Sequence, residues 1–456
     1  MRLLNTNHRT LAVSCVLVLL LVAASQSVRA DSASSVKAWN EIAVDAVINS
    51  TPYQNEGLIY MAYVSAAVYD AVVAIEDGYA PYGAGVTAPA GASVDAAVVE
   101  AAYRTLVHYL PAQSTALEPL HAGALAVIAD GQAKYDGLGV GQAAANLIIN
   151  LRTNDGRMPL ASTSAFPTRP PGPGVWRLTP SAFAAPQTPW VGNVRPFLID
   201  SVDRFLPDPP PPLFSIEWSE AYSEVRLFGS SASTARSAEQ TSTARFWTAN
   251  VIRQYNRVLR DLIDANSLSV LESARLQAMV NMVGADAQIA VMNAKYHYLF
   301  WRPVTAIDPG SVMPSGDGFG AFPRGFSDGN PATDEEPGWR PIAATPNHPE
   351  YPAAHGSITS AMAEVFRQFL DTNHFDLQVH GFDPAGAAGN LDAVRTFKTP
   401  GELRNQIVDA RVWAGFHYRF SGIEGVALGR KVAKSALRDA FRPACVRDEP
   451  VPARRP

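Results

Sequence analysis

Apolar residues recur at intervals of three and four along most of this chain, which is the spacing of one face of an α-helix. Convincing alternation of apolar and polar positions, which would indicate half-buried strands, is missing. The pattern therefore predicts an all-α fold. The predicted helices cover residues 58–76, 93–110, 116–129, 141–151, 214–228, 239–264, 271–301, 357–370, 402–413 and 423–440.

Start signals support several of these helices. Residues 237–240 and 269–272 read as capping boxes, in which a serine and a Glu or Gln three positions later satisfy each other's free backbone groups. Thr399 gives the strongest signal, because Pro400 at the first helical position and Glu402 follow it.

A proline-rich stretch divides the helical sequence into two groups. Proline fixes φ and removes a backbone donor, so residues 163–212 are predicted to form a long connection and not a helix. Residues 31–162 then form an N-terminal helical bundle, and residues 213–456 form a C-terminal bundle that carries the site. Aromatic residues in the connection favour packing on the helices. They are Trp176, Phe183, Trp190 and Phe197.

The N-terminus reads as a secretory signal peptide over residues 1–30. Arg2 and Arg9 precede an apolar run over residues 11–24, and a small residue, Ala30, suits cleavage. The run is shorter than the roughly 20 residues of a membrane span, although an uncleaved anchor is the alternative. We therefore expect an exported protein, secreted or periplasmic, with no stable membrane insertion.

Net charge and cysteine content bear on nucleic-acid binding and on disulfide formation. The formal net charge of −5 gives no reason to expect nucleic acid. Cys15 leaves with the signal peptide and Cys445 remains alone, so no intrachain disulfide is expected. Exposed aromatics in the connection could serve a homodimer, which the sequence does not decide.

Three short segments near the C-terminal end place cations and imidazoles in apolar helical sequence. Such a set suits a tetrahedral oxyanion, either phosphate or vanadate. An irregular stretch over residues 308–347 separates the first two segments and suits a loop that covers a site. The candidate residues are Lys295, Arg302, His348, His355, Arg411 and His417.

Spacing within the first segment favours convergence. Lys295 and Arg302 are seven apart, which returns to nearly the same helix face, while Pro303 disfavours helical geometry at Arg302. Burying both cations without an acid partner is costly, so a bound anion would explain them. Two surface charges on an ordinary helix are the alternative.

The other two segments have their own geometry. His355 lies after two prolines at a predicted helix N-terminus, where free N–H groups favour an anion, although a capping or core histidine would look the same. Arg411 and His417 are six apart and meet only if their helix ends near Gly415, with the His417 ring then facing the arginine.

Together the segments resemble the signature of vanadium-dependent haloperoxidases, within the phosphatidic acid phosphatase type 2 and haloperoxidase superfamily. That signature is Lys-x6-Arg-Pro, Pro-Ser-Gly-His and Arg-x5-His, and this chain has the same spacing in all three parts. The flanks Phe300-Trp-Arg-Pro303 and His417-Tyr-Arg-Phe420 look more like the haloperoxidase branch. The resemblance implies a double helical bundle.

The resemblance also implies roles. Lys295, Arg302 and Arg411 would bind the oxygens of vanadate, with phosphate able to occupy the same site. His417 would be the axial vanadium ligand, or the phosphorylated nucleophile of a phosphatase, and His355 the acid–base partner opposite. His348 is a halide-site candidate, because the bromide-oxidising members that this chain resembles tend to have a histidine at that position.

Two departures weaken the match. Ala353 and Ala354 replace Ser-Gly, so a hydroxyl donor to the oxyanion is lost, at about 1–3 kcal/mol if its partner oxygen stays charged and dry. Ser421 stands where the third motif usually has an aspartate, which weakens orientation of His417.

The leading hypothesis is an exported vanadate-dependent haloperoxidase-like enzyme that oxidises halide, bromide or iodide favoured, with hydrogen peroxide and a small organic acceptor. The first alternative is a secreted acid phosphatase of the same superfamily that forms a phosphohistidine intermediate. The second is a catalytically weakened anion-binding homologue.

Overall fold

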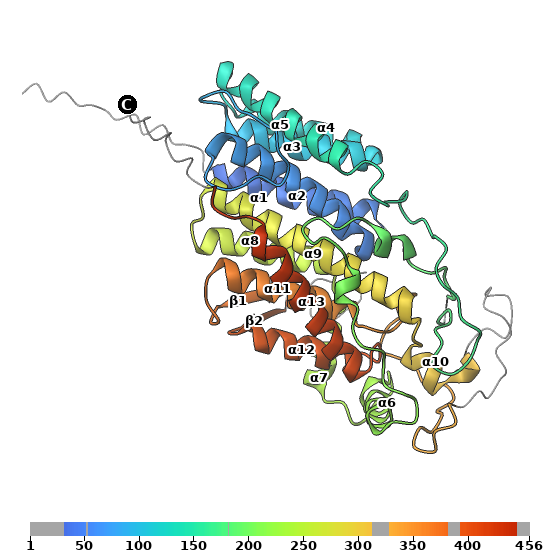
Figure 1. Ribbon diagram of the computed structural model, residues 1–456. Coiled ribbons are helices and arrows are strands. Elements are labelled where there is room, and N and C mark those ends of the chain that lie inside the picture. Colours follow the sequence, from blue (N-terminus) through green and yellow to red (C-terminus); the bar gives the residue numbers. More distant parts are fainter. Residues whose placement is uncertain (1–31, 52, 181, 312–327, 382–392, 445–456) are drawn as a thin grey trace, which may run out of the picture.

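The computed structural model describes residues 32–51, 53–180, 182–311, 328–381 and 393–444. The predicted signal peptide and both cysteines lie outside these residues. Long helices stack in layers across the molecule, from α3–α5 at one side, through α1 and α2, to α8 and α9, and then to α11–α13 (Figure 1). The helices are α1 (Ser32–Ser50), α2 (Gln54–Glu76), α3 (Val94–Tyr109), α4 (Ser114–Ala126), α5 (Gln132–Leu151), α6 (Ile216–Gly229), α7 (Ala238–Phe246), α8 (Val251–Ala265), α9 (Val270–Tyr298), α10 (Pro303–Ile307), α11 (Ala354–Phe369), α12 (Pro400–Trp413) and α13 (Arg419–Asp439).

The all-α prediction is confirmed for the described residues, with differences in detail. Helix α1 was not predicted, and the helix expected over residues 239–264 is two helices. Asn250 separates them, because its side chain accepts a hydrogen bond from the backbone N of Ile252 and so caps α8. The caps at Ser237, Ser269 and Thr399 are present.

A short antiparallel hairpin also departs from the predicted elements. It joins β1 (Leu377–His380) to β2 (Val394–Phe397), with Leu377 paired with Phe397. The Gln254 side chain of α8 donates to the backbone O of His380 at 3.1 Å, which ties the hairpin to that helix. Strands of four residues depend on such tertiary contacts and leave little pattern in a sequence.

The core runs through α2 and α9, which pack against each other (Figure 1). Within the described residues, α2 alone is long and apolar enough to cross a bilayer, and 89% of its most apolar window is buried inside the protein. A buried core helix meets the same criterion, so this is weak evidence for a membrane span. The division into two bundles remains a prediction.

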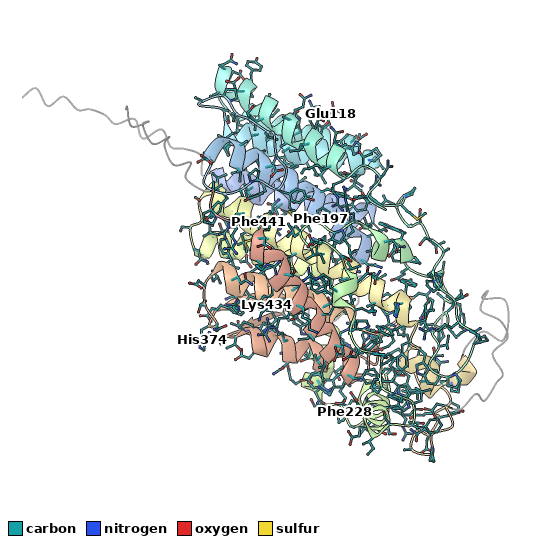
Figure 2. The ribbon with its side chains drawn as sticks, viewed as in Figure 1. Glu118, Phe197, Phe228, His374, Lys434 and Phe441 are labelled. Atoms are coloured by element: carbon teal, nitrogen blue, oxygen red, sulfur yellow. The ribbon has the colours of Figure 1, made fainter. Side chains whose placement is uncertain are left out.

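The proline-rich connection packs against these two helices, as its aromatics predicted. Trp176, Trp190 and Phe197 are buried and Phe183 is half-buried. Figure 2 shows Phe197 beside the ribbons of α2 and α9, and its backbone N donates to Asp286 of α9 at 2.6 Å. The connection is therefore ordered against the helices and not a free linker.

A buried acid in α2 predicts a pH-dependent stability. Glu56 is fully buried, its Oε2 accepts from the backbone N of Ala161 at 3.1 Å, and its Oε1 has no hydrogen-bond partner. Burial raises the pKa of this carboxyl to about 7. The folded state therefore keeps the proton between about pH 4.5 and 7 while the unfolded state loses it, so the contribution of Glu56 to stability falls as pH rises from 4.5 to 7 and is fully lost above 7.

We expect Glu56→Gln to remove this term. At pH 8 the variant should be more stable than wild type, and this advantage should be smaller at pH 4.5. The change in the difference of unfolding free energy between the two pH values should be on the order of 1–3 kcal/mol. Thermal melts of both proteins at the two pH values measure it. An equal difference at both values would mean that Glu56 is ionised in the folded protein throughout.

Candidate active site

The first segment is shaped by the end of α9. Lys295 lies in its last turn, fully buried, and donates to the backbone O of Pro349 at 2.9 Å and of Glu350 at 2.8 Å. The helix ends at Tyr298 because Leu299 takes a left-handed conformation with φ 50°. The prediction that Lys295 and Arg302 share one helix face is therefore wrong, and the chain turn brings them together.

Arg302 precedes α10 in extended conformation, as the following proline predicted. Its Nε donates to the backbone O of His348 at 3.0 Å, and one terminal nitrogen donates to the backbone O of Phe416 at 2.9 Å. The same nitrogen lies 3.2 Å from Nε2 of His417, and the other lies 3.0 Å from Nδ1 of His348. Arg302 therefore joins the second segment to the third.

His355 lies in the first turn of α11, which confirms its predicted place at a helix N-terminus, although the helix begins at Ala354. The side chain is 9% exposed, and its Nε2 is buried without a hydrogen-bond partner. An imidazole nitrogen left unsatisfied in this way is costly unless a ligand or water completes it.

Helix α12 ends at Trp413, as Gly415 predicted. Gly415 has φ +77°, and a Cβ there would lie 2.4 Å from the backbone O of Gly229, so only glycine fits. His417 follows in the connection to α13. Its ring faces Arg302 and not Arg411, which corrects the expectation of direct contact with Arg411.

Arg411 reaches the site from α12. One terminal nitrogen donates to the backbone O of Trp247 at 2.9 Å, and the guanidinium lies 4.7 Å from the ring centre of Phe416. Its Nε is buried without a partner. All three guanidinium nitrogens of Arg302 have a partner, whereas Arg411 has a nitrogen, Nε, without one.

One cavity of about 540 Å³ connects these groups. Its wall includes His348, His355, Arg411 and His417. Lys295 and Arg302 do not line it: Arg302 is bonded to the backbone O of the lining residue His348, and Lys295 to that of the next two residues. The start of α2 and residues 344–346, from the stretch predicted to cover a site, complete the lining.

The electrostatics of the site are strongly positive. Burial lowers the pKa of Lys295 well below its usual value and that of Arg411 to about 9, and the nearby guanidinium of Arg302 adds to both shifts. Burial, together with the cations, also lowers the pKa of all three site histidines well below 6.5. Among the described residues, Glu350 is the only carboxylate bonded to any of the six candidates.

Unsatisfied donors test whether an oxyanion suits this cavity. The side-chain Nε2 of Gln288, on α9, is buried without a hydrogen-bond partner, as are Nε2 of His355 and Nε of Arg411. All three residues line the cavity. Buried polar groups are normally satisfied, so three unpartnered nitrogens on residues of one cavity wall, one of them cationic, suit an anion with several oxygens.

Comparison with known proteins agrees with this geometry. Residues 275–444, which hold all six candidates, match the family model of the VCPO second helical-bundle domain. This part of the chain, fewer than half of its residues, is therefore similar to that domain.

The full-length proteins that this chain is similar to are distant in sequence. Vanadium chloroperoxidase of Curvularia inaequalis is 23% identical over 343 residues, which is 64% of this chain and about half, 52%, of the relative's length. The structure of the first bacterial vanadium-dependent iodoperoxidase is 20% identical with a TM-score of 0.73, covering 90% of this chain and 97% of that one. A holo-type bacterial vanadium-dependent chloroperoxidase has 18% identity and a TM-score of 0.63, covering 86% and 91%.

The departures from the haloperoxidase-family motif have visible consequences. Ala353 precedes α11 and provides no side-chain cap, and the methyl-bearing Ala354 lines the cavity where the motif has glycine. Ser421 is fully buried, and its Oγ lies 3.5 Å from the backbone O of Glu350.

Two residues of this site were not predicted from the sequence. Glu350 bonds to His417, and Gln288 lines the cavity. Weak signals existed: Glu350 is an acid between two prolines close to His355, and Gln288 lies seven positions before Lys295 on the same helix. Neither signal identifies a partner, because the contacts join different segments.

Proposed function

We propose that this protein is a vanadate-dependent haloperoxidase that oxidises halide with hydrogen peroxide. The observation that carries the proposal is the set of three unsatisfied nitrogens on Gln288, His355 and Arg411, residues that line one cavity together with His417. Vanadate, when bound, supplies the centre that accepts hydrogen peroxide and delivers an oxygen atom to halide without a change of oxidation state.

The residues of this chain bind the anion and stabilise charge. Arg411 and the amide of Gln288 would donate to its oxygens, with Gln288 in place of the serine hydroxyl lost at Ala353. Lys295 and Arg302, which do not line the cavity, act over a short distance, and Lys295 uses two of its three N–H groups on carbonyls. A dry site makes these cations more effective than they would be in water.

The two histidines have different tasks. His417, kept neutral by burial and by the neighbouring cations, would offer its Nε2 lone pair to vanadium. His355, which lines the cavity and has an unpartnered Nε2, would hold or move a proton on the opposite side. A bound anion would raise the pKa of His355 from its lowered value toward the working range of an acid–base group.

His348 supports a preference for bromide or iodide over chloride. Its ring lines the cavity and lies 3.0 Å from a terminal nitrogen of Arg302. A small organic acceptor would be halogenated near the mouth of the cavity, and export of the protein to the periplasm or medium would bring it to these substrates.

The neutral His417 also favours a second candidate, the acid phosphatase. A neutral imidazole with a free lone pair is what nucleophilic attack on a phosphate ester requires. The same cavity would hold either anion.

We expect paired assays of one purified sample to separate the candidates. Bromination or iodination of a phenol with hydrogen peroxide should appear only after orthovanadate loading, and excess phosphate should abolish it by occupying the same cavity. Hydrolysis of an aryl phosphate without vanadate is measured in parallel. Turnover of the ester alone would replace the haloperoxidase by the phosphatase, and silence in both, with the oxyanion still retained, would leave an anion-binding protein.

A further inference from the structure

The Glu350 carboxyl lies against the His417 ring. Its Oε1 accepts from Nδ1 of His417 at 2.7 Å and from the backbone N of Tyr418 at 3.1 Å, while Oε2 has no hydrogen-bond partner. Glu350 is fully buried, and its own backbone O is held by Lys295 at 2.8 Å. Hydrogen bonds therefore hold both the backbone and the side chain of Glu350 in place.

Two partners determine which nitrogen of His417 carries the proton. Nε2 lies 3.2 Å from a terminal nitrogen of Arg302, and a guanidinium can only donate, so Nε2 accepts. The proton is then on Nδ1, where it is donated to Glu350. Because Oε1 also accepts from Tyr418, this assignment holds whether or not Oε2 is protonated.

We propose that Glu350 is the positioning residue of His417: it holds the ring in the Nδ1–H tautomer, so that the unprotonated Nε2 can accept, here from Arg302. It thereby takes the part that the superfamily pattern gives to an aspartate at position 421, where this chain has serine. The proposal rests on the proposed function only in naming Nε2 as the atom that would bind vanadium. Outer partners of metal-binding histidines act in this way, fixing tautomer and orientation.

The position of Ser421 supports this exchange of roles. Ser421 is buried with its Oγ 3.5 Å from the backbone O of Glu350, so an acid at 421 would enter the space beside the residue that replaces it. An acid at both positions would bury two carboxylates together, which is costly. One acid, supplied from the second segment, is sufficient.

The test compares Glu350→Leu, which removes the acceptor, with Glu350→Gln, which removes the charge but keeps an acceptor oxygen. A third variant, Glu350→Leu with Ser421→Asp, returns an acid from the other segment. Glu335→Gln, at an exposed site, is the control. Ring ¹⁵N shifts of labelled histidine report the tautomer, with the His417 signal identified by its loss in His417→Ala. Equilibrium dialysis gives the dissociation constants of vanadate and of phosphate.

In wild type, Glu350→Gln and the Glu335→Gln control, we expect His417 protonated on Nδ1. In Glu350→Leu the Nδ1–H loses its acceptor while Arg302 still favours an unprotonated Nε2, so the share of the Nδ1–H tautomer should fall without reversing, and vanadate affinity should fall about 10–100-fold. Phosphate affinity should not fall, because removing an acid near three cations favours any anion that forms no bond to Nε2. The double variant should restore the Nδ1–H signal and vanadate affinity.

A Glu350→Leu variant with the wild-type tautomer and an unchanged ratio of vanadate to phosphate affinity would overturn the proposal. If that variant does not fold, Glu350→Ala, which leaves room for water, is measured by the same criteria. The tautomer is measured without vanadate, so it decides the role of Glu350 even if the protein oxidises no halide.

Discussion

Replacing His417 with alanine should abolish both halide oxidation and phosphate-ester hydrolysis. The residue would bond directly to vanadium or phosphorus, so the loss should exceed the roughly 10–100-fold typical of residues that only support a metal ligand. The helices should remain, because His417 lies in the connection between α12 and α13 and not within a helix. Initial rates of halide oxidation with saturating vanadate, and of ester hydrolysis without it, measure the loss of activity, and far-UV circular dichroism measures the helix content.

His374→Ala is the matched control for this loss. His374 is exposed at the outer surface of the molecule (Figure 2) and does not line the cavity, so its removal should leave turnover unchanged. Unchanged turnover in a folded His417→Ala variant would mean that the reaction centre lies elsewhere in the protein.

Replacing Arg411 with methionine should have two opposite effects. Without an anion, the variant should be as stable as wild type or up to about 2 kcal/mol more stable, because a buried cation without an acid partner is exchanged for an apolar side chain. The lost hydrogen bond to the backbone O of Trp247 offsets part of this gain. With an anion, the stabilisation seen in wild type should largely disappear.

Thermal melts in phosphate-free buffer and with increasing phosphate measure both effects. An anion at 100 times its dissociation constant stabilises the folded state by about 2.7 kcal/mol, which is large enough to resolve. Arg438→Met, which removes an exposed cation near the end of α13, should keep the wild-type phosphate response. An Arg411→Met variant that is several kcal/mol less stable without anion, yet responds fully to phosphate, would show a structural arginine.

The higher stability that we expect for Arg411→Met in the absence of an anion has a general reason. Functional sites retain buried charges that a stability optimum would remove, because those charges bind a ligand. Here burial lowers the pKa of Lys295 and Arg411, because a buried positive charge is costly and the neutral form is favoured. A bound oxyanion would reverse both shifts.

Much of the fold was predictable because it depends on local patterns. The cap at Thr399, the helix end near Gly415 and the place of His355 in a first helical turn are each determined by a few neighbouring residues. The helix break at Asn250 and the left-handed turn at Leu299 were missed, because neither residue type requires a break.

The sequence predicted which residues belong to the candidate site but not how they contact one another. Lys295, Arg302 and His348 do cluster with the other candidates, but a shared helix face is not what brings them together. The hydrogen bond between Glu350 and His417 joins residues 67 positions apart, so no local spacing encodes it. Gln288 likewise becomes a site residue only because α9 packs against α11.

The sequence by itself determined that this protein is helical, that three segments carry cations and imidazoles at the spacing of one family, and that two motif positions differ from that family. Only the tertiary structure decided which cations line the cavity, which donors lack partners, and which acid faces His417. The reason is physical. Helix propensity and capping act over a few residues, whereas burial, hydrogen-bond satisfaction and pKa depend on side chains that only folding brings together.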